Sequence, residues 1–342
     1  MDSFLTYYTQ CHKKSKFTRE LYRLNFRVYN HYSKGGIYVE ILYWFEKIRI
    51  PVLNEGMLLI TQLGEETAFL VVALILFWCV NKYTGYYVLS VGFIGTLANQ
   101  FLKLWFRVPR PWVLDGNFTI LEQAREAASG YSFPSGHTQS AVGTFGALAY
   151  ISKKTWVRGT AIAVAVLVPI SRMYIGVHTP ADVLVSAVLA LLLILVLRPV
   201  VFSENGKRMP FLLAAMMLLA AAYMCFVSLY PFPADIDSHN LESGIKNAYT
   251  LLGALVGLVL VYIVDEKWLN FSTKAVWWAQ ILKVVVGLLF VLAVKSGLKT
   301  PLNMFFGPSV GRAVRYFVIV IVAGVVWPLS FKWFAKIGKK DA

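Results

Sequence analysis

The stretch ADVLVSAVLALLLILVLRPVVFS, residues 181–203, decides the class of fold. Between Asp182 and Arg198 every residue except Ser186 is apolar. About 20 apolar residues in a helix span the ~30 Å hydrocarbon core of a bilayer. A helix also satisfies its own backbone hydrogen bonds there, where water cannot. The stretch therefore predicts a transmembrane helix.

Comparable apolar runs occur along most of the 342-residue chain, which is 58% hydrophobic. The 10 Trp and 18 Tyr residues fit aromatic belts at the two membrane interfaces. The sequence therefore predicts an all-α fold, a polytopic membrane helical bundle of about nine transmembrane helices. The expected spans are 67–81, 85–106, 137–152, 157–174, 181–203, 210–229, 246–264, 276–294 and 314–334.

The formal net charge is +15, but no basic stripe lies on a soluble domain. Anionic headgroups and the positive-inside bias explain this charge better than nucleic acid, and nothing in the sequence fixes an oligomeric state. The three cysteines, Cys11, Cys79 and Cys225, are far apart and are expected to be unpaired. The N-terminus lacks the apolar core of a signal peptide, so the first span is expected to act as an uncleaved signal.

Loop charge orients the spans. The connections 152–158 and 198–210 and the tail 332–342 are basic, which predicts that they are cytoplasmic in an integral protein of the plasma membrane. Residues 107–134, 175–180 and 230–243 then lie on the extracytoplasmic face. Two features do not fit this assignment. The basic residues within 295–315 fall on the extracytoplasmic side, and the basic extension 1–56 would also lie on that side unless part of it crosses the membrane. An interfacial amphipathic helix is expected near the end of that extension.

Three polar segments fall on this one predicted side. They are KLWFRVPRP (103–111), PSGH (134–137) and SRMYIGVHTPAD (171–182). The spans 137–152 and 157–174 form a hairpin that returns the chain to the same face. The three segments can therefore converge into one site.

The convergence would create a phosphate site. Lys103, Arg110 and Arg172 supply fixed positive charges, and arginine offers a fork of donors that suits phosphate oxygens. Ser135 and Gly136 stand at the start of a helix, where free N–H groups and the helix dipole favour an anion. No acidic cluster that would bind a metal accompanies them, so neither a metal nor another cofactor is expected.

His178 and Asp182 are four residues apart around the entry of a helix. A carboxylate hydrogen-bonded to one imidazole nitrogen fixes the tautomer and leaves the other nitrogen free to attack phosphorus. His137 can donate a proton to the departing oxygen, which typically contributes about 10²–10⁴ in rate. These three residues are the expected catalytic groups.

Each residue also has a purely structural interpretation. Asp182 can be the N3 acid of a helix that begins at Thr179 and Pro180. Arg172 can be an interfacial anchor, Lys103 can extend to the membrane surface, and Pro134–Gly136 can be an ordinary turn. The occurrence of all of them on one face favours a site.

The three segments resemble the signature of the type 2 phosphatidic acid phosphatase superfamily, which also includes vanadate-dependent haloperoxidases. That signature is Lys, six residues, Arg-Pro; then Pro-Ser-Gly-His; then Ser-Arg, five residues, His, three residues, Asp. Every position is filled here. The resemblance implies a six-helix core and metal-independent hydrolysis through a phosphohistidine. By position, His178 is the implied nucleophile, Asp182 its partner and His137 the acid. The implied phosphate ligands are Lys103, Arg110, Ser135, Gly136 and Arg172.

We therefore expect a lipid phosphate phosphatase whose substrate is a membrane lipid, with a core at 57–204 and additional helices at 205–342. Polyprenyl diphosphate, phosphatidic acid and phosphatidylglycerophosphate are candidate substrates. The alternatives are a lipid phosphotransferase that uses the same histidine, a haloperoxidase and a non-enzymatic lipid phosphate transporter. Lys283, inside an apolar run, is expected to face the bundle or extend to the surface. Glu65 and Glu66 are explained as acids at a helix start.

Overall fold

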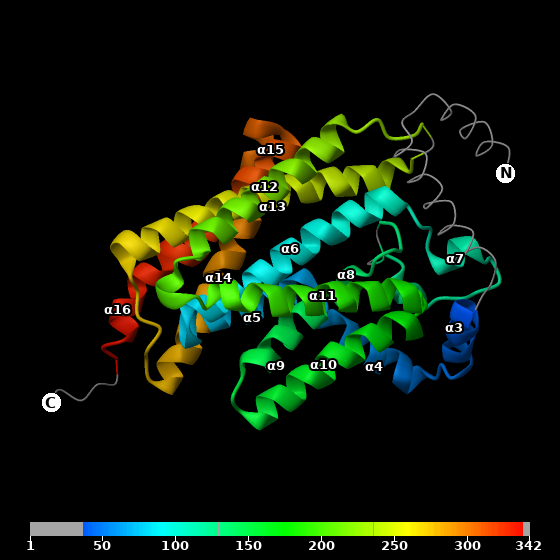
Figure 1. Cartoon of the computed structure of the whole chain (residues 1–342), viewed down its shortest axis with the longest axis horizontal. Coiled ribbons are helices and arrows are strands. Elements are labelled where there is room, and N and C mark those ends of the chain that lie inside the picture. Colours follow the sequence, from blue (N-terminus) through cyan, green and yellow to red (C-terminus); the bar gives the residue numbers. More distant parts are fainter. Residues whose placement is uncertain (1–36, 127, 129, 235, 338–342) are drawn as a thin grey trace.

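The computed structural model describes residues 37–126, 128, 130–234 and 236–337. Within these residues the chain forms helices and turns and no strand, so the predicted all-α fold is confirmed. The helices form an elongated bundle, with α3 (Ile37–Lys47) near one end and α16 (Phe331–Phe334) near the other (Figure 1).

Six helices of the described chain are long and apolar enough to cross a membrane. They correspond to the six spans predicted from residue 157 onward. They are α10 (Thr155–Tyr174), α11 (Pro180–Val201), α12 (Met209–Leu229), α13 with its π-helical continuation (Ser238–Leu269), α14 (Trp277–Gly297), and α15 continued into α16 (Lys299–Phe334).

The predicted count of nine spans is not confirmed. The expected span 85–106 is α6 (Lys82–Phe106), which carries Asn99 and Lys103 in its second half. The expected span 137–152 is a helix over Gly136–Ile151, made of α8 (Gly136–Ala141), a π-helical turn and α9 (Ala147–Ile151). At 1.5 Å per residue it is only about 24 Å long. Most of α6 is buried by other helices, so it does not need the apolar surface of a lipid-facing helix.

The expected span 67–81 is one arm of a bent pair. α4 (Pro51–Gln62) and α5 (Glu66–Ile75), which continues into a π-helical segment to Val80, are bent by 53° relative to each other. Only together are they long enough for a seventh crossing. The amphipathic helix expected before residue 56 falls on α3 and the start of α4, with Pro51 at the first position of α4.

The helix α6 lies at the centre of the bundle. It packs against α5, α8 and α11, and also against α12 and α13 (Figure 1). The apolar core is continuous from Phe69 in α5 to Phe331 in α16. The last helices therefore belong to the same packed structure as the first ones.

Polar contacts join the C-terminal helices to α5. Trp78 donates from Nε1 to the main-chain oxygen of Ala323 at 2.9 Å. Lys283 is fully buried and donates from Nζ to the main-chain oxygens of Trp78 at 2.8 Å and Thr273 at 3.2 Å. Its ammonium also lies 4.4 Å from the ring centroid of Phe331. Lys283 thus faces the bundle and binds main-chain oxygens of the segment after α5 and of the connection before α14, one of the two placements expected for it.

Candidate active site

The first motif lies where α6 ends. Lys103 is in the last turn of α6, is buried, and donates from Nζ to the main-chain oxygen of Tyr131. The helix ends at Arg107, which has φ 51° and so turns the chain away. Arg110 follows and donates from Nε to the oxygen of Gly130 at 3.0 Å and from Nη1 to that of Val177 at 2.9 Å. Two cations of the motif are thereby fixed on the loops that carry the other motifs.

The second motif begins α8. Ser135 is the N-cap, and its Oγ accepts from the N–H of Thr138 at 3.4 Å, as N-cap serines do. Its own N–H donates to the main-chain oxygen of Asp182 at 3.2 Å, and its oxygen accepts from Nδ2 of Asn99 at 3.3 Å. A Cβ built on Gly136 would have no heavy atom within 4 Å, apart from its neighbours in the chain and in its own helix. The start of α8 is thus held between α6 and α11 and is open at Gly136.

The third motif joins α10 to α11. Arg172 is in the last turn of α10, and its main-chain oxygen accepts from the N–H of Val177 and of His178. Gly176, at φ +87°, makes this tight return possible, since L side chains rarely adopt that conformation. Thr179 then caps α11 reciprocally with Asp182. The helix-cap interpretation of Asp182 is therefore correct, but it is only part of the role of this residue.

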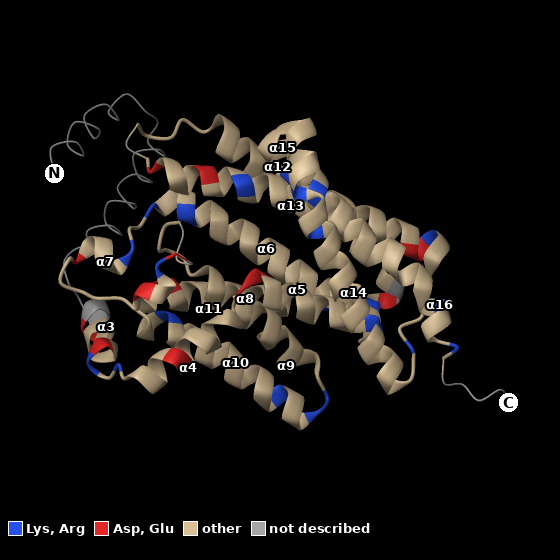
Figure 2. Cartoon of the chain, turned by 180° about the vertical axis from the view of Figure 1, so that it is seen from behind, with Lys and Arg blue, Asp and Glu red and all other residues tan. Residues whose placement is uncertain are grey.

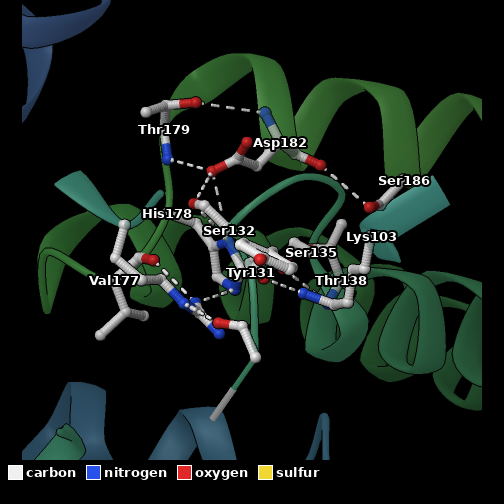
Figure 3. A network of polar contacts seen from close by, with 12 residues as sticks. Lys103, Tyr131, Ser132, Ser135, Thr138, Val177, His178, Thr179, Asp182 and Ser186 are labelled. Atoms are coloured by element: carbon white, nitrogen blue, oxygen red, sulfur yellow. Dashed lines mark hydrogen bonds and ion pairs between the residues drawn. The ribbon is translucent and has the colours of Figure 1, made fainter. Parts of the chain in front are cut away.

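The side chains of Arg110, His178 and Asp182 form a chain of contacts. Figure 3 shows His178 beside Asp182. Nη1 of Arg110 lies 2.9 Å from Nε2 of His178, and Nδ1 of His178 lies 3.3 Å from Oδ2 of Asp182. A guanidinium donates hydrogen bonds and cannot accept them. Nε2 must therefore be the unprotonated nitrogen, and the ring proton lies on Nδ1, toward the carboxylate. This is the tautomer in which Nε2 can act as a nucleophile.

Ser132 belongs to this network although the sequence did not single it out. It is fully buried, and its hydroxyl donates to Oδ2 of Asp182 at 2.6 Å and lies 3.5 Å from Nδ1 of His178. The same carboxylate oxygen accepts from the N–H of Thr179 at 2.8 Å. Asp182 is thus held by its own helix and by the loop that carries the second motif (Figure 3).

Thr61 is a second contributor that the sequence did not reveal. It is a buried residue in the last turn of α4, and its Oγ1 accepts from Nη1 of Arg172 at 2.7 Å. Arg172 is almost completely buried, and its Nε has no hydrogen-bond partner within the described residues. The α4 helix therefore helps to aim a guanidinium that retains donor capacity.

His137 is half-buried at the first turn of α8. It lies within electrostatic reach of His178 and of the three cations Lys103, Arg110 and Arg172. Its backbone contacts the α4–α5 turn, because a Cβ built on Gly64 would lie 2.9 Å from the main-chain oxygen of His137. The structure thus brings every predicted site residue to one end of the bundle.

The charges of the site act on the groups that lie in its loops. Burial lowers the pKa of His178 well below the ordinary value for histidine, and the positive charges of Arg110 and Arg172 lower it further. Burial also lowers the pKa of Arg110 to about 10. His178 is consequently neutral at neutral pH, whereas Arg110 remains charged. No group of three His, Cys, Asp or Glu residues that could hold a metal ion lies in the described ranges.

Known proteins resemble the chain in two regions. The PAP2 superfamily model matches residues 83–206, and a model described as PAP2 superfamily phosphatase, transmembrane extension, matches residues 249–340. The first match covers the three motifs from Lys103 to Asp182. The second match covers the helices from the middle of α13 onward.

Individual relatives align with the catalytic part. Phosphatidylglycerophosphatase B of Bacillus subtilis is 36% identical over 174 residues, which cover 47% of this chain and 80% of the relative. Undecaprenyl-diphosphatase BcrC of the same organism is 29% identical, covering 42% of this chain and 72% of the relative. An undecaprenyl-diphosphatase of Sulfolobus acidocaldarius is 29% identical, covering 44% and 71%. The chain therefore belongs to the PAP2 superfamily and is a membrane-embedded phosphoric ester or diphosphate hydrolase.

Proposed function

We propose that the protein removes the terminal phosphate of a lipid phosphomonoester or diphosphate through a phosphohistidine at His178. One observation carries the proposal. The unprotonated Nε2 of His178 is presented among Lys103, Arg110 and Arg172, while Nδ1 is directed to Asp182. A neutral nucleophile beside three cations suits a dianionic phosphate better than any neutral substrate.

When phosphate binds, the cations of the site exchange their main-chain acceptors for phosphate oxygens. Without substrate, Lys103 and Arg110 donate to the main-chain oxygens of Tyr131, Gly130 and Val177, and Arg110 also covers Nε2 of His178. A phosphate is a stronger acceptor than a main-chain oxygen, because charge-assisted hydrogen bonds are shorter and about twice as strong. When Arg110 turns to the phosphate, Nε2 is released to face phosphorus. Gly136 and the first N–H groups of α8 add donors.

The first chemical step forms the P–N bond and breaks the P–O bond to the lipid. The lone pair of Nε2 attacks phosphorus, and the departing oxygen takes a proton from His137, which binds that proton when the dianionic phosphate offsets the charges of the three surrounding cations. Asp182 stabilises the positive charge that develops on the ring of His178 through the proton on Nδ1. Ser132 keeps the carboxylate in place during this change.

The second step restores the enzyme. A water molecule gives a proton to His137 and attacks phosphorus, the P–N bond breaks, and its electron pair returns to Nε2. Inorganic phosphate leaves, and both histidines recover their starting protonation states. Positioned cations can supply most of the stabilisation of the transferring phosphoryl group, so the scheme needs no metal. We expect undiminished activity in excess EDTA.

The names of the relatives guide the choice of substrate. Phosphatidylglycerophosphate and polyprenyl diphosphates each place a terminal phosphate on a membrane lipid, and both fit a site at the end of a helical bundle. Orientation follows from charge. The opposite end carries basic loop residues at 153, 154, 207 and 208, which supports a cytoplasmic location for that end and an extracytoplasmic active site.

Phosphate release from a panel of lipid phosphates by the purified full-length protein tests this function. We expect release from at least one of the two lipid classes, inhibition by orthovanadate, and loss of release in His178→Ala. Acid-labile phosphate bound to the protein should appear with a labelled substrate and disappear in His178→Ala. Full activity of a folded His178→Ala protein would disprove the assignment of the nucleophile. Transfer of the label to a lipid acceptor with little free phosphate would indicate a phosphotransferase instead.

A further inference from the structure

A second group of cations lies in the C-terminal helices. We call Lys295, Arg312 and Arg315 the extension cluster. Lys295 is in the last turn of α14, and the two arginines follow a break in α15 at Gly307, which has φ 75°. Figure 2 shows Lys and Arg residues in the part of the bundle where α12, α13 and α15 overlap, away from the end that carries α7. None of the three forms an ion pair with any residue that the structure describes.

Arg315 is the most constrained member. Its side chain is only 6% exposed, and its Nε is buried without a hydrogen-bond partner within the described chain. Close packing explains why α15 cannot turn Arg315 away: a Cβ on Gly253 of α13 would lie 2.1 Å from the main-chain oxygen of Ala313. A buried charge without a counter-ion is costly, so such groups are normally paired.

A carboxylate lies near two members of the extension cluster. Glu66, at the first position of α5, lies within electrostatic reach of Lys295 and Arg312, and also of Tyr316. The cluster carries three positive charges and Glu66 one negative charge, so these four residues together have an excess of positive charge. The alternation of the spans puts this excess on the same side of the membrane as the active site, where the positive-inside bias does not explain it.

The turn between α4 and α5 separates the extension cluster from the active site. On one side of the turn, Glu65 lies within electrostatic reach of Arg172, and Gly64 packs against His137. On the other side, Glu66 faces the cluster. The extension cluster and the cations of the active site therefore lie on opposite sides of this short turn.

We propose that the extension cluster binds the phosphodiester headgroup of an anionic phospholipid, as a site distinct from the catalytic one. Arginine presents the donor fork that suits phosphate, and the surface of a bilayer supplies phosphodiesters permanently. The flanking apolar side chains of α14 and α15, which include Phe305 and Phe306, are exposed and can contact acyl chains. The proposal does not depend on the catalytic mechanism, because the ligand lacks a terminal phosphate.

Binding of fluorescent phosphatidylglycerol to the purified full-length protein tests the site. We expect Arg315→Gln to weaken binding about tenfold and Arg315→Lys to restore part of it. Glu66→Gln should strengthen binding, because it removes the opposing charge of Glu66 near Lys295 and Arg312. Arg158→Gln is the matched control, since Arg158 is an arginine near the start of α10, at the other membrane face, and should leave binding unchanged. Zwitterionic phosphatidylcholine should bind more weakly than phosphatidylglycerol to the wild type.

Several results would overturn the proposal. Equal losses in Arg315→Gln and Arg158→Gln would show an unspecific charge effect. Weaker binding in Glu66→Gln, or binding of inorganic phosphate that depends on Arg315 without any binding of phosphatidylglycerol, would exclude a lipid headgroup as the ligand. If Arg315→Gln fails to fold, the gain in Glu66→Gln and the behaviour of Arg315→Lys decide the question. His178→Ala should bind phosphatidylglycerol normally, which separates this result from failure of the proposed phosphatase activity.

Discussion

At the scale of single residues, Asp182 connects helix formation with chemistry. The same carboxylate oxygen closes the capping box of α11 and lies against Nδ1 of His178. His178, the proposed nucleophile, is therefore oriented by the same carboxylate that starts the helix. Ser132 adds a donor from a different loop, so that the position of the carboxylate depends on two segments.

Ser132→Ala should lower kcat. The variant removes a hydrogen bond to a charged group, which typically contributes about 1.5–3 kcal/mol, and about tenfold or more in rate follows if that amount is lost in the transition state. Steady-state kinetics on the best lipid substrate measure the change. Ser186→Ala is the control, because Ser186 donates to the main-chain oxygen of Asp182 and not to its carboxylate. Equal losses in both variants would contradict a role for Ser132 in positioning the carboxylate.

Arg110→Gln should move the acid limb of the pH profile of kcat/KM. The positive charge of Arg110 lowers the pKa of His178, so its removal raises that pKa. A nucleophile with a higher pKa becomes protonated earlier as the pH falls, and the limb therefore shifts to higher pH. Comparison on one substrate cancels the ionisation of the substrate itself. Arg107→Gln is the control, since Arg107 is not among the groups that shift this pKa. A limb that stays in place, or shifts to lower pH, would contradict the electrostatic coupling.

At the scale of secondary-structure elements, α4 supports the site from outside the three motifs. Its last turn carries Thr61 against Arg172, and the turn that follows it carries Gly64 against His137. The 53° bend between α4 and α5 allows both contacts, because a straight helix would carry the chain past the site. This arrangement predicts that small changes in α4 alter substrate binding.

Thr61→Val should raise KM for the lipid phosphate by roughly tenfold, because a nearly isosteric side chain no longer holds the guanidinium of Arg172. The effect on kcat should be smaller, since Thr61 does not touch the nucleophile. Kinetics together with a melting curve check this expectation. Thr250→Val provides a matched control, as Thr250 is a buried threonine in α13 whose hydroxyl donates to the main-chain oxygen of Lys246 in its own helix. An unchanged KM in Thr61→Val, or the same rise in both variants, would argue against this role.

The sequence predicted those features that local spacing determines. The helix entry at Thr179–Asp182, the helix start at Ser135 and the six apolar spans from residue 157 onward all depend on neighbours along the chain. Thr61 and Ser132 were missed because their partners lie 111 and 50 residues away. The count of nine spans stays a prediction, because α6 and Gly136–Ile151 lie among other helices, where burial by protein replaces contact with lipid.

At the scale of the whole molecule, the C-terminal helices stabilise the catalytic part. Lys283 and Trp78 form a short chain of hydrogen bonds from α14 through the end of α5 to the segment after α15. Lys82 and Asp265 form a second link, with 2.8 Å between Nζ and Oδ2. These contacts join the C-terminal helices to the catalytic part, and the two parts share one apolar interior.

Lys283→Met should lower the melting temperature of the entire protein in one transition. Methionine fills a similar volume but removes the Lys283 donor from the main-chain oxygen of Trp78, and a buried unsatisfied group costs about 1–3 kcal/mol. The main-chain oxygen of Thr273 still accepts from Nε2 of Gln280. Thermal unfolding in detergent, followed by circular dichroism and by residual phosphatase activity, measures the effect. Lys274→Met is the control, because Lys274 is exposed. Loss of the C-terminal helices alone, with activity retained at the original temperature, would contradict the shared interior.

The contact of Trp78 with Ala323 has a consequence for biosynthesis. The two residues are 245 positions apart, and ribosomes add about 5–20 residues per second. At that rate, roughly 10–50 seconds pass between the synthesis of Trp78 and the synthesis of Ala323, so the indole has no partner during this time. During this interval the nascent helices are exposed to lipid on surfaces that later become buried. A chain released before residue 323 would leave that surface open permanently, and such chains are natural targets for membrane proteases.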